Sequence, residues 1–513
     1  MKILLSTLNA RYAHASLGLR YLRANLRELR ECAQIVEFVI GQKTEDVAEQ
    51  LLLLNPDVLG LGVYIWNIVE STRLVTQLKL LKPELIIVLG GPEVSYEHEH
   101  QSIVQLADHL ITGWGDVSFY ELMAVLANPQ GILQPKIIVG KQPPLEAIAW
   151  PYDEFSDHDL AQRTLYVEAS RGCPFKCEFC LSSLDKSAWA FPQGEFLAQL
   201  DTLYQRGARV FKFVDRTFNL KIDASLDILH FFLAKLEQAQ QQGQPLPFLH
   251  FELVPDHLPE RLKSVIALFP PGTLQFEIGI QTLNPDVQAR ISRRQKNQLA
   301  LDNLVWLRQN SNAHLHVDLI AGLPGENLTS FADGFNQLVA VKPHEIQFGI
   351  LKRLRGTPII RHTESFQLRF NPEPPYNILS TDQLDFLTLQ RMARFGKYWD
   401  LIANSGRFSQ GLLHLLGDSA FDQFMSFSDW LFAQSKSSHG LAVDRLFDYL
   451  TAYVQTPQFD GEAEAALKAI SADRARVSQN ARSGVKRVDA ANRSTPSRQR
   501  RHLGEPLKTL FSS

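Results

Sequence analysis

Short apolar runs alternate with amphipathic helical stretches through residues 1–135, and this alternation limits the fold more than any other feature of the sequence. Helical spacing of apolar residues between the runs is clearest over residues 17–29. Strands that are apolar on both faces and alternate with helices predict a parallel, doubly wound sheet of the flavodoxin or Rossmann type. The strand runs are residues 2–8, 34–40, 58–64, 85–89 and 109–111.

Loops that follow the carboxyl ends of these strands are the expected ligand site, because doubly wound sheets bind ligands at that edge. Three of the four loops carry glycine or other small residues, which let a flat ligand approach the backbone. The pattern GxGxxG is absent from the sequence, which disfavours ordinary dinucleotide binding. The loops are residues 9–16, 64–67, 90–96 and 113–116.

A second series of strands and helices follows a proline-punctuated stretch, residues 136–160, which we interpret as a linker. Six strand–helix units predict a partial TIM-like (β/α)6 barrel over residues 161–375, with its chemistry at the carboxyl ends of the strands. Residues 376–475 have helical patterns, and residues 476–513 are polar, basic and poor in aromatics, which predicts a disordered tail. The six strands are expected at residues 164–169, 210–214, 248–253, 274–280, 316–320 and 345–350.

Composition and charge indicate where the protein works and what it binds. The formal net charge is −3, and no apolar run approaches the roughly 20 residues that a bilayer span needs. Three of the four cysteines fall within residues 173–180, so a disulfide framework is disfavoured and the cytoplasm is expected. Basic residues gather near the C-terminus, but without interleaved aromatics they support only weak, salt-sensitive attraction to nucleic acid.

Cys173, Cys177 and Cys180 form a C-x3-C-x2-C pattern on the loop that leaves the first strand of the second series. Three thiolates can hold three irons of a cubane and leave the fourth iron without a protein ligand. That iron can chelate the amino and carboxylate groups of S-adenosylmethionine, so that an electron from the cluster breaks the sulfonium C–S bond. The alternatives are a zinc site, which would need a fourth ligand that the sequence does not supply nearby, or inert buried thiols.

Residues 160 to about 355 resemble the radical S-adenosylmethionine superfamily, whose signature is this cysteine pattern with an aromatic residue before its last cysteine. The resemblance implies a [4Fe–4S] cluster on the three cysteines, with S-adenosylmethionine bound along the strand ends. Each polar or glycine position also has a structural alternative: a helix N-cap, a salt-bridged carboxylate, or a residue of a turn. The implied S-adenosylmethionine contacts are Phe179, Asp215, Glu252, Gln281, Asp318 and Gly322.

A flavodoxin-like domain placed before such a barrel resembles the cobalamin-binding subgroup, and the chain is most similar to a bacterial branch with an extra helical C-terminal domain. The resemblance implies cobalamin on the loops that contain Gly90, Gly91, Gly113 and Gly115. In relatives a D-x-H-x-x-G motif supplies the lower cobalt ligand. Here His14 is present but Tyr12 replaces the Asp, so His14 is either that ligand or a loop histidine bonded to backbone.

Together these resemblances imply methyl transfer to an unactivated carbon, with an electron donor such as flavodoxin or ferredoxin and no membrane partner. One alternative is a radical rearrangement or oxidation in which cobalamin donates no methyl group. Another is an RNA-binding protein that uses the metal loop as scaffold. Arg353 and Arg355 follow the last strand, where they could clamp an anionic substrate or be solvated. The sequence indicates neither the substrate nor a catalytic side chain.

Overall fold

The computed structural model describes residues 1–128, 134–185, 187–482 and 494–503. Within these residues the chain divides into two compact units. The first contains Met1–Asp215 with the short segments Arg353–Pro358 and Asn371–Tyr376. The second contains Arg216–Lys352, Ile359–Phe370 and Asn377–Ser513. None of the helices described is both long and apolar enough to cross a bilayer.

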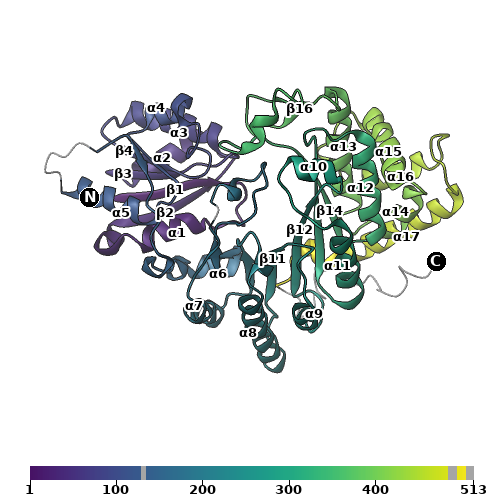
Figure 1. Ribbon diagram of the computed structural model, residues 1–513, viewed down its shortest axis with the longest axis horizontal. Helices are drawn as coiled ribbons and strands as arrows, with labels where there is room; N and C mark the ends of the chain where they lie inside the picture. The colour runs from purple at the N-terminus through teal and green to yellow at the C-terminus, as the bar shows by residue number, and fades with distance from the viewer. Residues whose placement is uncertain (129–133, 186, 483–493, 504–513) are drawn as a thin grey trace. The chain divides into compact units, whose positions relative to one another are not determined.

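The first unit is built on a parallel sheet of six strands in the order β2-β1-β3-β4-β5-β6 (Figure 1). Because β1 pairs with β2 on one side and β3 on the other, the direction of the strand order reverses at β1. Such a reversal opens a crevice at the carboxyl ends of the strands, which is the ligand edge that the sequence predicts. The strands are β1 (Ile3–Asn9), β2 (Ala33–Val39), β3 (Val58–Gly62), β4 (Ile86–Gly90), β5 (His109–Thr112) and β6 (Ile137–Val139).

Helices cover both faces of this sheet, which confirms the doubly wound arrangement. One core packs under side chains of α2 (Thr44–Leu53), α3 (Ile68–Leu81) and α4 (Ser102–Leu106). The opposite core packs under α1 (Leu17–Ala24) and α5 (Asp116–Ala127). Every residue of β1 is buried, as expected for a strand covered on both faces.

The predicted linker is part of the fold. Its first residues form β6, which pairs with β5, and its last residues begin helix α6 (Asp157–Gln162). Residues 136–160 are therefore not simply a linker, and the first domain extends past residue 135. Three strand residues between prolines are too short a run for periodicity to reveal.

A second parallel sheet has six strands in the order β14-β13-β12-β11-β10-β7, as predicted for a partial barrel. Along β12 and β13 buried residues alternate with half-buried ones, so one face packs under helices and the other carries polar side chains. The strands are β7 (Leu165–Val167), β10 (Val210–Phe213), β11 (Phe248–Leu253), β12 (Leu274–Gln281), β13 (His314–Ala321) and β14 (Glu345–Ile350).

The last part of the second unit is helical, as predicted. Helix α13 (Phe386–Ile402) packs against β14, and α15 (Ala420–Ser435) packs on α12 (Leu328–Val341) and α13 (Figure 1). Helix α14 (Ser409–Leu416) contacts α17 (Ala463–Arg482).

The prediction of a disordered tail over residues 476–513 is wrong where the structure describes that segment. Helix α17 continues to Arg482, and residues 494–503 contain the short helix α18 (Ser497–Arg501). Arg498 forms ion pairs with Glu345 and Asp400, so basic residues predicted to be solvated are partly neutralised by the barrel and α13. Residues 483–493 and 504–513 lie outside the described residues.

Candidate active site

The cysteine loop leaves the short strand β8 (Ser170–Arg171) and closes on itself. The backbone N–H of Cys173 donates to the Asp185 carbonyl at 3.1 Å, and that of Cys180 donates to the Cys177 carbonyl at 3.1 Å. Gly172 has φ +87°, and a Cβ there would lie 2.1 Å from the Ser187 carbonyl oxygen, so this turn requires glycine. Cys173 is buried, while Cys177 and Cys180 are half-buried.

The donor set of this loop fits an iron–sulfur cluster. All four cysteines are thiols that form no disulfide. Within the residues that the structure describes, no three His, Cys, Asp or Glu side chains are grouped to enclose a single metal ion. A cubane does not require the three cysteines to converge on one ion, because each thiolate binds a different iron of the cluster. Phe179, the aromatic residue of the signature, is half-buried beside the last of the three cysteines.

Asp215 braces the strand that leads into this loop. Its carboxylate accepts hydrogen bonds from the Ala169 backbone N–H at 2.9 Å and from the Ser170 hydroxyl at 2.5 Å. The side chain is buried, and burial raises the pKa of Asp215 to about 7. It does not cap the next helical turn, η6 (Phe218–Leu220), whose N-cap is Thr217. Its side chain therefore serves the cysteine segment.

Arg171, two residues before Cys173, ties the cysteine loop to the first sheet. Its Nη1 and Nη2 donate to the two carboxylate oxygens of Asp116 at 2.8 and 3.2 Å, which is a bidentate pair. Asp116 is buried at the start of α5, directly after the loop that follows β5. The guanidinium also lies over the rings of Tyr21 and Trp114, at 4.5 and 4.8 Å from their centroids.

The predicted cobalamin glycines lie at the ligand edge of the first sheet. Gly90 ends β4, and Gly113 and Gly115 flank Trp114 between β5 and α5. Gly91 has φ +110°, and a Cβ there would lie 2.4 Å from the Val63 carbonyl oxygen. The loop after β4 thus packs directly on the loop after β3, where the rings of Tyr64 and Trp66 stack with centroids 4.4 Å apart.

His14 lies in the loop after β1, with its Nδ1 2.6 Å from the Tyr166 hydroxyl. Burial, together with the charges of Lys212 and Arg11, lowers the pKa of His14 below its usual value. The ring is therefore neutral at pH 7, which is the form that binds metals. The Tyr166 hydroxyl thus occupies Nδ1, and Nε2 is the other ring nitrogen.

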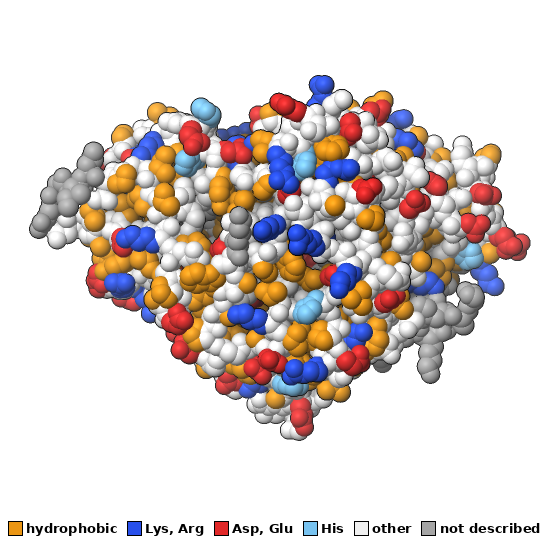
Figure 2. All heavy atoms as spheres, viewed as in Figure 1, with side chains coloured by type: hydrophobic (Ala, Val, Ile, Leu, Met, Phe, Trp, Pro, Cys, Tyr) orange, Lys and Arg blue, Asp and Glu red, His pale blue; other side chains and the backbone are white. Residues whose placement is uncertain are grey.

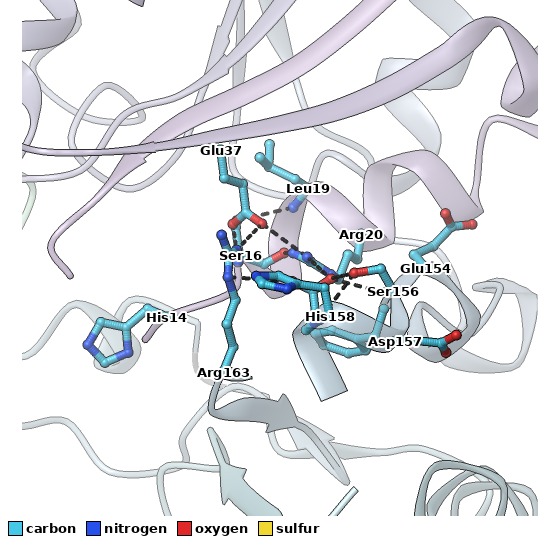
Figure 3. Close-up of polar contacts among 12 residues, drawn as sticks. His14, Ser16, Leu19, Arg20, Glu37, Glu154, Ser156, Asp157, His158 and Arg163 are labelled. Atoms are coloured by element: carbon cyan, nitrogen blue, oxygen red, sulfur yellow. Dashed lines mark hydrogen bonds and ion pairs between the residues drawn. The ribbon is translucent and has the colours of Figure 1, made fainter. Parts of the chain in front are cut away.

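Glu37 on β2 orders this loop (Figure 3). One of its oxygens accepts from the Ser16 backbone N–H at 2.6 Å and from the Asn9 amide at 2.9 Å. The other accepts from Arg20 at 3.0 Å and from Arg163 at 2.8 Å. Because Arg20 also pairs with the buried Asp159, the start of α6 is joined to the loop that carries His14.

In the second unit, three predicted residues lie on the polar face of the barrel strands or directly after them. Glu252 on β11 is salt-bridged to Arg216 at 3.0 Å. Asp318 on β13 lies opposite Gly279 of β12 and pairs with His316 at 3.4 Å. Gly322 follows β13 at φ +87°, with the Ile378 side chain against it. The salt-bridge alternative thus describes Glu252, and Asp318 has a histidine beside it.

Gln281 is the most unusual of the predicted residues. It ends β12 at a bulge, in the left-handed region at φ +68°, where a glutamine is rarely found. Its side-chain oxygen is buried and has no hydrogen-bond partner among the described residues. Strained backbone and unsatisfied buried polar atoms concentrate at functional sites, so this amide oxygen is a candidate contact for a ligand.

Glu326 was not singled out by sequence reasoning as a site residue. One of its oxygens accepts from the Thr282 hydroxyl, and the other is buried without a partner among the described residues. Burial raises the pKa of Glu326 to about 7. Its only sequence signal is its place directly after Gly325, which cannot reveal that the second oxygen is buried.

Comparisons with known proteins agree with this division of the chain. Residues 3–123 match the family described as the B12 binding domain, and residues 167–338 match the Radical SAM superfamily. Residues 364–481 match a protein family of unknown function, DUF4080. The resemblance to cobalamin-binding radical S-adenosylmethionine proteins with an added helical region is thereby confirmed.

Individual relatives are distant. The cobalamin-dependent radical SAM methyltransferase TokK of Streptomyces tokunonensis is 25% identical over 369 residues, covering 63% of this chain and 51% of TokK. The chain spans about half the length of the curated relatives it matches. Among solved structures, the cobalamin-dependent radical enzyme OxsB aligns over 99% of this chain and 83% of its own, with TM-score 0.60 and 14% identity. The methyltransferase TsrM of Kitasatospora setae covers 73% and 80%, with TM-score 0.57 and 13% identity. These two likenesses concern the fold.

Proposed function

We propose that this chain, in which a B12-binding domain precedes a radical SAM domain, is a cobalamin-dependent radical S-adenosylmethionine enzyme that methylates an unactivated carbon. The pair between Arg171 and Asp116 carries the proposal, because it joins the cysteine loop to the edge of the B12-binding sheet within one compact unit. Two cofactors that act in one reaction need their binding loops held together in this way.

Cys173, Cys177 and Cys180 would hold a [4Fe–4S] cluster, which supplies the electron that cleaves S-adenosylmethionine. Gly172 shapes the turn into the first of them, and Asp215 fixes the preceding strand. Gln281 and Glu326 would bind S-adenosylmethionine through their unsatisfied buried oxygens, with Glu252, Asp318 and Gly322 on or directly after neighbouring strands of the same unit. An electron donor such as flavodoxin or ferredoxin and a reducing compartment, the cytoplasm, suit a loop of three thiols.

Cobalamin, which carries methyl groups, would bind at the loops that contain Gly90, Gly91, Gly113 and Gly115. A sheet edge with little side-chain bulk suits a flat macrocycle. His14 would face the cobalt through Nε2, because Tyr166 occupies Nδ1 and Glu37 holds the loop.

Two observations weigh against the RNA-binding alternative. Arg498 of the basic tail forms ion pairs with two carboxylates of the second unit. On the face shown in Figure 2, both signs of charge occur and are mixed with apolar side chains. Neither favours a basic stripe along which a nucleic-acid backbone would lie.

Anaerobic reconstitution of the full chain with iron, sulfide and cobalamin tests the proposal. We expect bound iron and corrin, formation of 5′-deoxyadenosine after reduction, and transfer of label from methyl-labelled S-adenosylmethionine to the corrin fraction. Formation of 5′-deoxyadenosine without any labelled corrin would favour rearrangement or oxidation. Intact S-adenosylmethionine in reduced, fully loaded protein would refute the proposal.

A further inference from the structure

A cavity of about 550 Å³ lies in the second unit, at the amino ends of the barrel strands. Its walls come from the segment that enters β14 and from helices α13, α14, α17 and α18. Six of its lining residues are basic, and none of the described lining residues is acidic. The six are Arg308, Lys342, His344, Arg476, Arg501 and His502.

Arg308 and His344 lie side by side in the lining. The Leu315 backbone N–H donates to His344 Nδ1 at 2.9 Å, so the proton of the neutral ring is on Nε2. Burial keeps the pKa of His344 well below its usual value, which makes the neutral ring the relevant form. Arg308 Nη1 lies 3.0 Å from that Nε2. This part of the lining therefore places a guanidinium directly beside a polar ring edge.

Arg501, at the end of α18, adds a further positive charge to the lining. Arg501 donates through Nε to the Ser405 carbonyl at 2.6 Å, but it takes part in none of the ion pairs found among the described residues. Burial and the nearby guanidinium groups of Arg407 and Arg498 lower the pKa of Arg501 to about 10. In contrast, Arg476 is paired with Asp473 at 2.8 Å. The cavity thus contains a partly buried cation that forms no ion pair among the described residues.

The remaining lining is largely apolar and comes mostly from α12, α13 and α14. A ligand with only a charged group would leave this surface unused, whereas an organic anion would contact both parts. The apolar lining residues include Val339, Trp399, Leu412, Leu413 and Leu416.

This cavity cannot be part of the S-adenosylmethionine site. His344 immediately precedes β14, and Arg308 lies near the end of the helix that leads into β13. Gln281 and Gly322 lie at the other ends of β12 and β13. A strand of eight residues, such as β13, is about 26 Å long.

We propose that this cavity binds a small organic anion, with its carboxylate or phosphate group against Arg308, His344 and Arg501 and its apolar body against Trp399 and the leucines of α14. The site is independent of the proposed function and lies at the far end of the barrel strands. A ligand there would stabilise the packing of α18 and the DUF4080 helices on the barrel.

Calorimetric titration of the holoprotein with phenyl phosphate and with benzoate tests the inference, with benzyl alcohol as the uncharged control. At least one anion should bind tenfold or more tightly than benzyl alcohol, and the stronger of the two identifies the charged group. Arg501→Gln should weaken that binding at least tenfold. Arg500→Gln, which removes the same charge one residue away from the cavity lining, should change it less than twofold.

A second variant guards against loss of folding. Ser409→Glu places a carboxylate at the cavity wall, at the first turn of α14, and should abolish anion binding without lowering the thermal unfolding midpoint. Anions that bind no better than benzyl alcohol would overturn the inference. Equal effects of Arg500→Gln and Arg501→Gln would also overturn it.

Discussion

Arg355 donates through Nε to Glu93 Oε1 at 2.8 Å and joins the segment after β14 to the loop after β4 of the first sheet. Glu93 is buried and also accepts from the Tyr376 hydroxyl at 2.6 Å. Arg353 pairs in the same way with Glu97 at 2.6 Å. Both arginines are therefore committed to carboxylates of the first unit, and neither is a free clamp for an anionic substrate.

Glu93→Gln should destabilise the first unit by about 1–3 kcal/mol, because it removes the nearest carboxylate from the partly buried Arg355 guanidinium and leaves only Glu97, at 3.7 Å. Urea unfolding measures the change. Glu99→Gln removes an acidic residue from the same segment, but its side chain is 64% exposed and should contribute less than about 0.5 kcal/mol. Equal effects of the two substitutions would contradict the importance of this network.

Cys177→Ser should reduce bound iron from about four per chain to a small fraction of that, because the cluster would keep only two thiolates. Bound corrin should remain, since the glycine loops of the first sheet are untouched. Cys32→Ser removes an exposed cysteine outside the loop and should leave iron content unchanged. Iron retained in the Cys177 variant would show that the loop is not the cluster site.

Gln281→Met should weaken S-adenosylmethionine binding about tenfold without lowering stability. The buried amide oxygen has no partner to lose within the described residues, and replacing an unsatisfied polar group with an apolar one is close to neutral. Equilibrium dialysis and urea unfolding provide the two measurements. Gln367→Met changes another left-handed glutamine that is exposed, and it should affect neither. Loss of stability with unchanged affinity would make Gln281 a purely structural residue.

Glu326→Gln should change how stability depends on pH. Burial raises the pKa of Glu326 from 4.5 to about 7. Between these two pH values the folded protein keeps the Glu326 proton, whereas the unfolded chain releases it. Its stabilising contribution is present below pH 4.5 and is lost as pH rises through 7, on the order of 3 kcal/mol.

The glutamine introduced at this position stays neutral, so unfolding free energies of the variant should fall less between pH 5 and pH 8 than those of the wild type. The exposed Glu364→Gln should keep the wild-type slope. Identical slopes for wild type and Glu326→Gln would mean that Glu326 titrates normally.

Local pattern was sufficient for much of this protein. The apolar runs predict both parallel sheets, and the cysteine spacing predicts the cysteine loop. Both patterns involve residues that are close together in the sequence, so they can be recognised without the tertiary structure. The strand β6 shows the limit of such local patterns, because three residues between prolines are too few to show the periodicity of a strand. The tail was wrongly expected to be disordered, because its ion pairs with Glu345 and Asp400 join residues about 100 positions or more apart.

What tertiary structure alone decided is which polar groups meet and which remain buried without a partner among the described residues. Spacing could place Asp215 and Gln281 at strand ends, but not show that the first braces the cysteine segment while the second has an unsatisfied oxygen. The pair between Arg171 and Asp116 joins positions 55 residues apart, and the cation-lined cavity draws on five separate segments. Such relationships depend on packing of the whole chain, because the energy of a charge or a hydrogen bond is set by what surrounds it after folding.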